Sequence, residues 1–294
     1  MISRIIVLIV ACFCTSVSAQ SQIRIAFNPE KGKTYTYRFI TEQTSSQSAR
    51  GQEMTTNYSM EFLIDMIIKD KNKNEISMDY VYKEIVFVFS HPTMNFNVDS
   101  KDKNNNTTDI AKFFDCLIGK SLQIIVSPEG SVKSITGFQP IRENMNSVIT
   151  SADETVQRIA GMFIQMSFHE FAIKTNFEQS FKMYPDKAIE VGDSWSIDKS
   201  HTVGQITNNV QNTYMLKSVN DNIALIDLSV VSSLKNESLD RELKNEQKGE
   251  IMLNVENGML VQFSSTENSN MSVSVQGTDI ISNSKTKVTV YLQQ

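Results

Sequence analysis

The chain has 294 residues, and its 28 Lys and Arg against 33 Asp and Glu give a formal net charge of −5 at pH 7. Basic residues form no cluster, which excludes the electrostatic footprint of a nucleic-acid-binding protein. A chain of this length can bury a core large enough to fold without disulfides or a structural metal.

The first residues have the form of a secretory signal. Arg4 supplies a positive charge, residues 5–13 form a short apolar core, and Val17-Ser-Ala19 fits a small-residue cleavage site. The apolar core is too short to span a bilayer. We therefore expect an exported protein, periplasmic or extracellular, with no transmembrane segment in a mature chain that starts at Gln20.

An alternative for the same stretch is a loose lipobox at Ile9-Val-Ala-Cys12, which would leave a lipid-anchored protein beginning at Cys12. Cleavage after residue 19 instead leaves Cys116 as the only cysteine, so no intramolecular disulfide could form. Cys116 lies in an apolar run without a nearby histidine, and we interpret it as a small buried hydrophobe and not as a nucleophile.

Alternating residues predict a first series of strands. Apolar positions in residues 23–27 and 35–39 lie on either side of a turn at Glu30-Lys-Gly32, which predicts an opening hairpin. In residues 54–68 every even position except Thr56 is apolar, so one face of this strand should be buried and the other wet.

The alternation changes phase at Lys83-Glu84, which predicts a β-bulge. A short helix is expected at residues 109–118, followed by strands at 122–126 and 132–136 on either side of a turn at Pro128-Glu-Gly130.

The middle of the chain has the spacing of helices. One apolar stripe is formed by Val156, Ile159, Ala160, Phe163 and Ile164. Ser151 and Glu154 have the form of a capping box, which predicts a helix start at about Ala152. Further capping patterns at Ser167 and Thr175 predict a segmented helical run, and Pro185 ends it.

A second series of strands begins near Trp195, and Asn257-Gly258 is a strong hairpin signal within it. The two series resemble each other weakly. Gly32-Lys-Thr-Tyr35 parallels Gly192-Asp-Ser-Trp195, and residues 119–130 parallel residues 249–258. Either an internal repeat or strand alternation alone could produce this similarity.

No catalytic or metal site is supported by residue spacing. Ser194 and His201 are residue types of a serine hydrolase, but within one strand they would lie about 23 Å apart. His169 lacks a second zinc-binding histidine, because position 173 is Ile173. The polar stretches 70–74 and 102–106 do not continue as calcium-binding loops. We therefore expect no enzyme activity, no cofactor and no metal.

Three segments resemble a family of secreted bacterial envelope proteins of unknown function: Gly51-Gln-Glu-Met-Thr55, Gly119-Lys-Ser-Leu122, and residues 184–195. The resemblance covers most of the mature chain. It implies an envelope location in a Gram-negative bacterium, but no activity and no catalytic residues. The order of elements is also similar to that of periplasmic lipoprotein carriers, whose open half-barrel encloses an apolar cavity under helices.

We predict an α+β fold, mainly antiparallel β, with a large twisted sheet or half-barrel in two strand series and a central helical segment, about 139–184, that covers one face. Residues 1–19 would form the signal peptide and 20–294 a single β-rich domain. The strand series would occupy 20–137 and 188–294, around a helical segment at 138–187.

Two functions fit this architecture. The first is a non-catalytic cell-envelope protein that binds a hydrophobic small molecule or a lipidated protein in an apolar cavity between sheet and helices. The residues predicted to line it are Met54, Tyr58, Met60, Phe62, Met66, Phe163 and Trp195. The alternative is a structural or protein-interaction module with a fully packed core, because interiors are normally close-packed. Trp195 is expected to be buried in either case.

The exported form is predicted to begin at Gln20. Its intact mass should equal that of residues 20–294, whereas a diacylglyceryl mass on Cys12 would contradict this prediction.

Overall fold

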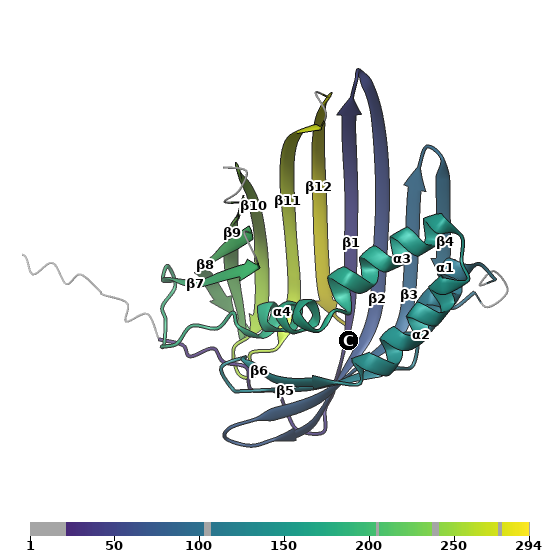
Figure 1. Cartoon of the computed structure of the whole chain (residues 1–294). Coiled ribbons are helices and arrows are strands. Elements are labelled where there is room, and N and C mark those ends of the chain that lie inside the picture. Colours follow the sequence, from purple (N-terminus) through teal and green to yellow (C-terminus); the bar gives the residue numbers. More distant parts are fainter. Residues whose placement is uncertain (1–21, 103–106, 204–205, 237–240, 276–277, 294) are drawn as a thin grey trace, which may run out of the picture.

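The computed structural model describes residues 22–102, 107–203, 206–236, 241–275 and 278–293. Over these residues the chain forms a 12-stranded antiparallel sheet and four helices (Figure 1). The mainly antiparallel α+β fold with a large open sheet is therefore as predicted. The predicted signal peptide and the cleavage site before Gln20 lie outside the described residues.

The first strand series consists of β1 Thr34–Ala49, β2 Gln52–Lys71, β3 Ile76–His91, β4 Met94–Asp99, β5 Ser121–Val126 and β6 Val132–Thr136. The helices are α1 Asp109–Asp115, α2 Phe138–Thr150, α3 Glu154–Ser167 and α4 Glu170–Phe181. The second series consists of β7 Ser194–Val203, β8 Ile206–Asn220, β9 Ile223–Asn236, β10 Arg241–Asn254, β11 Leu260–Val275 and β12 Thr278–Leu292. The strand order is β6-β5-β3-β2-β1-β12-β11-β10-β9-β8-β7, with β4 paired to β3 outside this path.

Strand β2 shows the predicted alternation. Its even positions Ile64, Met66 and Ile68 are buried, whereas the odd positions between them are partly exposed. The predicted bulge is also confirmed, because Leu63 pairs with Glu84 and Ile64 with Tyr82, which leaves the residue between them unpaired.

The predicted opening hairpin is wrong. Of residues 23–27, only Ile23 forms a β-bridge, and its partner is Ile189 at the start of the second series. Ile25 is fully buried among side chains of the second series, and the ring of Phe27 lies 4.9 Å from that of Phe181. Alternation correctly indicated which side chains are buried, but it carries no information about the distant segments that bury them.

The helical segment starts and stops at different residues from those predicted. Helix α3 is capped by Asp153, whose side chain accepts hydrogen bonds from two backbone N–H groups, while Ser151 forms the C-cap of α2. Thr175 lies inside α4 and causes no break. The predicted stripe of α3 is confirmed, since Val156, Ala160 and Ile164 are buried and the other two residues pack against the same core.

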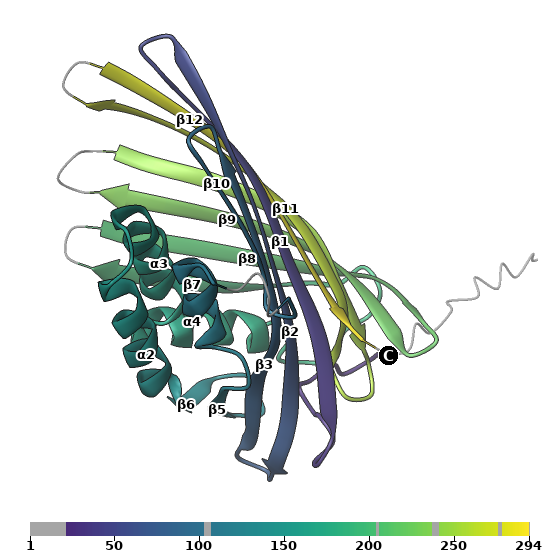
Figure 2. The same ribbon diagram turned by 90° about the vertical axis from the view of Figure 1, so that its right-hand side faces the viewer.

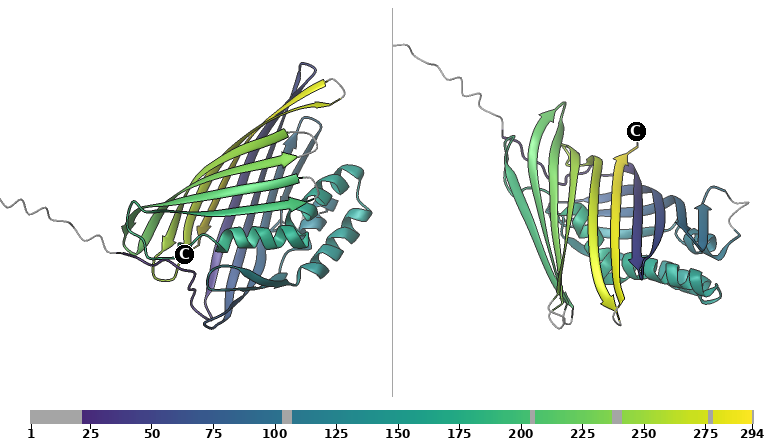
Figure 3. Two further views of the ribbon diagram at one scale, coloured as in Figure 1. Left: turned by 60° about the vertical axis from the view of Figure 1, so that its left-hand side comes forward. Right: turned by 90° about the horizontal axis from the view of Figure 1, so that it is seen from above.

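The helices lie on one side of the twisted sheet, which we call the inner face (Figures 2 and 3). The larger hydrophobic cluster fills the space between the helices and the first strand series. A second cluster lies on the inner face of β8 to β10, where Leu216, Ile226 and Ile251 are covered by Ile25 and Ile189. The segments that lead into β1 and β7 thus take part in packing the second cluster.

The weak similarity between the two halves corresponds to repeated geometry. The N–H of Gly32 donates to the carbonyl of Ile68, and the N–H of Gly192 donates to that of Leu216. The residues after the two glycines accept the return bonds from Ile68 and Leu216. Both glycines have positive φ, +81° and +98°, which favours glycine in each turn.

The repeat continues into β2 and β8. A register shift follows Ile68 in β2 and Leu216 in β8, and the extra residue is a lysine in each strand. Lys69 pairs with Asp79 at 3.6 Å, and Lys217 pairs with Asp227 at 3.2 Å. The structure therefore favours an internal repeat over chance alternation.

The two halves also support each other through glycine hairpins. Gly130, between β5 and β6, lies against the backbone of Phe181, and Gly258, between β10 and β11, lies against the backbone of Ala26. A Cβ atom at either glycine would overlap the neighbouring carbonyl oxygen. Each hairpin therefore packs closely against the segment that leads into the other strand series.

Gly130→Ala and Gly258→Ala should each lower the free energy of unfolding by more than about 3 kcal/mol, because the strain of positive φ is added to a backbone clash. Gly119→Ala is the matched control, since Gly119 also has positive φ but no atom within 4 Å of an added Cβ. It should lose only about 1–2 kcal/mol in urea denaturation. An equal decrease in the free energy of unfolding for all three variants would show that the backbone contacts of Gly130 and Gly258 do not contribute to stability.

Candidate ligand-binding face

Aromatic side chains fill the space between the helices and β3. The ring of Phe114 in α1 lies 5.1 Å from Phe87, that of Phe168 after α3 lies 6.3 Å from Tyr82, and that of Phe177 in α4 lies 5.0 Å from Tyr80. The last pair is perpendicular, the geometry preferred by aromatic rings. This part of the inner face is therefore closed by the protein itself.

Tyr80 and Tyr82 retain some contact with solvent although they lie deep in this packing. Burial raises the pKa of both hydroxyls well above its ordinary value, so both are protonated at neutral pH. Within the described part of the chain, neither hydroxyl has a hydrogen-bond partner. Both rings therefore belong to the packing between the helices and the sheet.

Away from this packing, the strands extend past the helices (Figure 1). One set of directly paired inner-face positions crosses seven strands from β4 to β10: Phe96, Phe89, Tyr58, Gln43, Thr286, Glu267 and Gln247. We call these seven residues the inner row. All seven are partly exposed. The residues immediately before and after Gln43, Glu267 and Gln247 along their strands point to the opposite, outer face.

The inner row is apolar at one end and polar at the other. Phe96 and Phe89 lie 6.0 Å apart and pack against the main core, and burial raises the pKa of Tyr58 beside them. From Gln43 onward the side chains are amides, a hydroxyl and a carboxylate. The row can therefore contact both parts of an amphiphilic molecule.

The structure places four of the predicted site residues in sequence along the inner face of β2. Met66 is buried, Phe62 and Met60 pack half-buried against the core, and Tyr58 belongs to the inner row. Met54 shares this face but lies at the far end of the strand, where 47% of its surface is exposed. Exposure thus increases along β2 from the helices to the hairpin tip.

Phe163 lies on α3 and belongs to a separate part of the same packing. Its ring contacts those of Phe113, Phe114 and Phe168 at 5.4 to 5.8 Å. Phe168 in turn contacts Tyr82, whose ring lies 5.8 Å from Phe62. Phe163 supports the wall next to β2 through these intervening rings.

Trp195 is not near the other six predicted residues. It lies on β7, stacks on Tyr214 at 5.3 Å and donates a hydrogen bond from Nε1 to the carbonyl of Met183 at 3.0 Å. It is half-buried and packs against the second hydrophobic cluster, whereas we expected full burial. Its burial is incomplete because β7 is an edge strand, with β8 as its neighbour on one side and no strand on the other.

Sequence reasoning missed most of the inner row. Of its seven residues, only Tyr58 is among the predicted site residues. The aromatic content of residues 85–96 was an available signal. The polar members carry no such signal, because their proximity follows from strand order and register.

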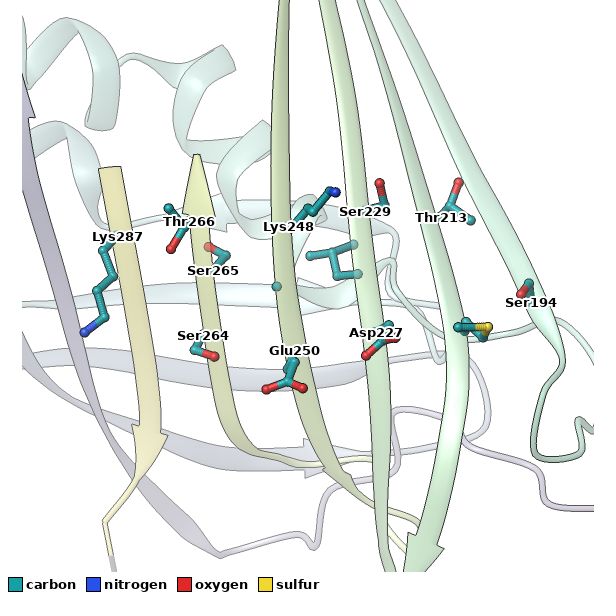
Figure 4. Close-up of a pocket in the computed structure, with 13 residues that line it drawn as sticks. Ser194, Thr213, Asp227, Ser229, Lys248, Glu250, Ser264, Ser265, Thr266 and Lys287 are labelled. Atoms are coloured by element: carbon teal, nitrogen blue, oxygen red, sulfur yellow. The ribbon is translucent and has the colours of Figure 1, made fainter. Parts of the chain in front are cut away.

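A hollow of about 680 Å³ lies on the outer face of β7 to β12 (Figure 4). It is lined by hydroxyl groups and by charged residues of both signs, among them Asp227, Lys248, Glu250 and Lys287. Asp227 pairs with Lys217, and Lys287 lies 3.8 Å from Glu42. These charges are those of a solvated outer face and do not suit an apolar ligand.

Residues considered for chemistry are not brought together. Ser194 and His201 lie near opposite ends of β7. Cys116 is free and half-buried, and burial, followed by the charge of Asp115, raises the pKa of its thiol. Among the described residues, no group of three His, Cys, Asp or Glu side chains could hold a metal ion.

The architecture defines a class of open antiparallel sheets with helices against one face. Residues 73–260, more than half of the chain, match the model of a family of unknown function, DUF6263, and the chain belongs to this family. No protein with a curated description is similar enough in sequence to count as a match. No helix of the described residues has both the length and the apolar character needed to cross a membrane.

Several solved structures follow a partly similar chain path. A structure described as showing lipid-protein interactions in lipovitellin has 12% identity and a TM-score of 0.49, covering 90% of this chain and 25% of that one. The chain therefore spans about a quarter of lipovitellin. A Bacteroides fragilis protein with a YmcC-like fold has 7% identity and a TM-score of 0.23, covering 92% and 100%. The translocator domain of autotransporter NalP from Neisseria meningitidis has 8% identity and a TM-score of 0.34, covering 89% and 90%. Values this low do not establish a shared function.

Buried tyrosines predict a loss of stability at high pH. Burial raises the pKa of Tyr37, Tyr80, Tyr82 and Tyr184 above the ordinary value of about 10. The neutral forms are favoured in the folded chain, so their stabilising effect is complete below about pH 10 and is lost as the pH rises above it. The free energy of unfolding should therefore fall between about pH 10 and 12 in denaturant titrations.

Tyr82→Phe provides the control for this prediction. The Tyr82 hydroxyl has no hydrogen-bond partner in the described residues, so the variant should match the parent near pH 7 and lose less stability above pH 10. An identical pH dependence in both proteins would contradict the assignment of Tyr82.

Proposed function

We propose that the chain is a non-catalytic protein of the cell envelope that binds a hydrophobic or amphiphilic ligand at the apolar end of the inner row. One observation carries the proposal. Phe96, Phe89, Tyr58 and Met60 lie on three adjacent strands, face the same side as the core, and are only partly buried. Contiguous apolar surface of this kind marks binding sites on soluble proteins.

The surroundings of these side chains support the proposal. Phe87 and Val98, the next pair on the same face of β3 and β4, are almost fully buried, so the exposed rings continue directly into the main core. Met60 adds a flexible thioether, which can adapt to acyl chains of different shape. Covering this surface with hydrocarbon would contribute roughly 25 cal/mol for each Å² removed from water. The acyl chain could belong to a free lipid or to a lipidated protein.

The proposed location rests on the N-terminal sequence. Arg4, the apolar core at 5–13 and the small residues before Gln20 favour export to the periplasm or the extracellular space. Lipid anchoring at Cys12 is the competing outcome, and both place the folded chain where lipids and lipidated proteins are handled.

A protein-interaction module is the second candidate. The aromatic contacts under the helices show ordinary close packing, and exposed apolar side chains occur near the hairpin tips at Met54, Met271 and Ile281. Their exposed fractions are 47%, 38% and 48%. This candidate predicts that removal of these side chains abolishes partner binding while lipid binding is absent.

Met60→Trp should weaken binding of the neutral dye N-phenyl-1-naphthylamine at least about tenfold, because an indole would occupy the space next to Tyr58. Val88→Trp is the matched control, since Val88 lies on the neighbouring strand, is 41% exposed and faces outward. Dye fluorescence should be unchanged by this control. Absence of dye binding to the parent protein, or equal binding by both variants, would contradict the proposed function.

A further inference from the structure

We propose that the ligand is an amphiphile whose head group donates hydrogen bonds and bears no negative charge. This inference rests on the proposed function and adds the chemistry of the head group. The head group would lie over the polar end of the inner row, at Gln43, Thr286, Glu267 and Gln247, with its chain over Tyr58, Phe89 and Phe96.

The register of the sheet makes this polar end continuous with the apolar end. Tyr58 pairs with Gln43, Gln43 with Thr286, and Thr286 with Glu267, so the side chains succeed one another across β2, β1, β12 and β11. Gln247 on β10 follows Glu267 in the same way. Because neighbouring strands lie about 4.8 Å apart, the change from aromatic to polar side chains occurs within one strand spacing.

The polar end offers mainly hydrogen-bond acceptors. Gln247 donates from Nε2 to the hydroxyl of Ser265 at 2.7 Å, which leaves its amide oxygen available. The carboxylate of Glu267 offers acceptor oxygens and no donor. Gln43, Thr286 and Glu267 have no side-chain hydrogen bond or ion pair with any residue that the structure describes. A head group with hydroxyl or ammonium donors would satisfy these groups.

Among the described positions around it on the inner face, Glu267 is also the only charged residue. The paired positions on one side of it are Thr41, Val288, Ser265 and Gly249. Those on the other side are Ser45, Ser284, Ser269 and Asn245, the last two joined by a hydrogen bond of 3.0 Å. No described cation among these positions offsets the carboxylate. A carboxylate or phosphate head group would therefore meet repulsion, whereas a neutral or cationic one would not.

The test compares probes that share a dodecyl chain. Dodecyl maltoside, dodecylammonium and dodecanoate, each below its micelle concentration at pH 8, would displace N-phenyl-1-naphthylamine from the full-length mature protein. We expect dodecanoate to bind about tenfold or more weakly than the maltoside and the ammonium probe. Equal affinity for dodecanoate would overturn the inference and leave the proposed function standing. Failure of the dye and of all three probes to bind would instead overturn the proposed function.

Variants at Glu267 locate the effect. Glu267→Gln keeps the shape of the side chain and should bring dodecanoate to within about threefold of the maltoside. Glu267→Lys should reverse the preference between dodecylammonium and dodecanoate. Glu250→Gln is the matched control, because Glu250 lies on the adjacent strand but on the outer face, and it should preserve the parent ratios. A shift in this control as large as that in Glu267→Gln would overturn the inference.

Discussion

Strand β12 is the element on which the inner face depends. Its residues 280–292 pair with residues 37–49 of β1, and its opposite edge pairs with β11, so the last strand of the chain joins the two strand series. This pairing places Thr286 between Gln43 and Glu267 and carries the inner row from aromatic to polar side chains. Backbone hydrogen bonds between opposite ends of the chain therefore create the surface that we assign to ligand binding. Such non-local pairing is slow to form, because a long loop must close before the contacts stabilise it.

Much of the local structure could be predicted from the sequence. The alternation in β2, the bulge after Leu63 and the apolar stripe of α3 each depend on neighbouring residues, and all three are present. The prediction of an opening hairpin was wrong because it required a non-local partner to be identified. Residues 23–27 alternate because they are buried by distant segments, with Ile23 paired to Ile189, and a period of two does not identify the partner.

The candidate site was predictable only along single strands. Met60 and Met66 share a face of β2 because side chains alternate in every strand. Trp195 could not be placed, since its distance from β2 depends on the six strands that lie between β2 and β7 in the sheet. Glu267 could not be singled out for the same reason. A single acidic residue is notable here only because its neighbours on the inner face are uncharged, and the strand register determines which residues those neighbours are. Alternation within single strands thus predicted residues of the apolar half of the surface, whereas the polar half is visible only from the strand order and register of the folded chain.

The repeated geometry shows that the same backbone pattern carries side chains of different polarity in the two halves of the chain. Counted back from the equivalent bulges after Ile68 and Leu216, the inner positions Met60 in β2 and Asn208 in β8 correspond to each other. Backbone ladders tolerate either residue, because the hydrogen bonds that hold neighbouring strands together do not involve side chains. Inner positions away from the helices can therefore differ in polarity between the halves, whereas the positions that pack against the helices are apolar. The backbone pairing thus leaves the polarity of these positions unconstrained, and the register alone brings aromatic and polar side chains together along the inner row.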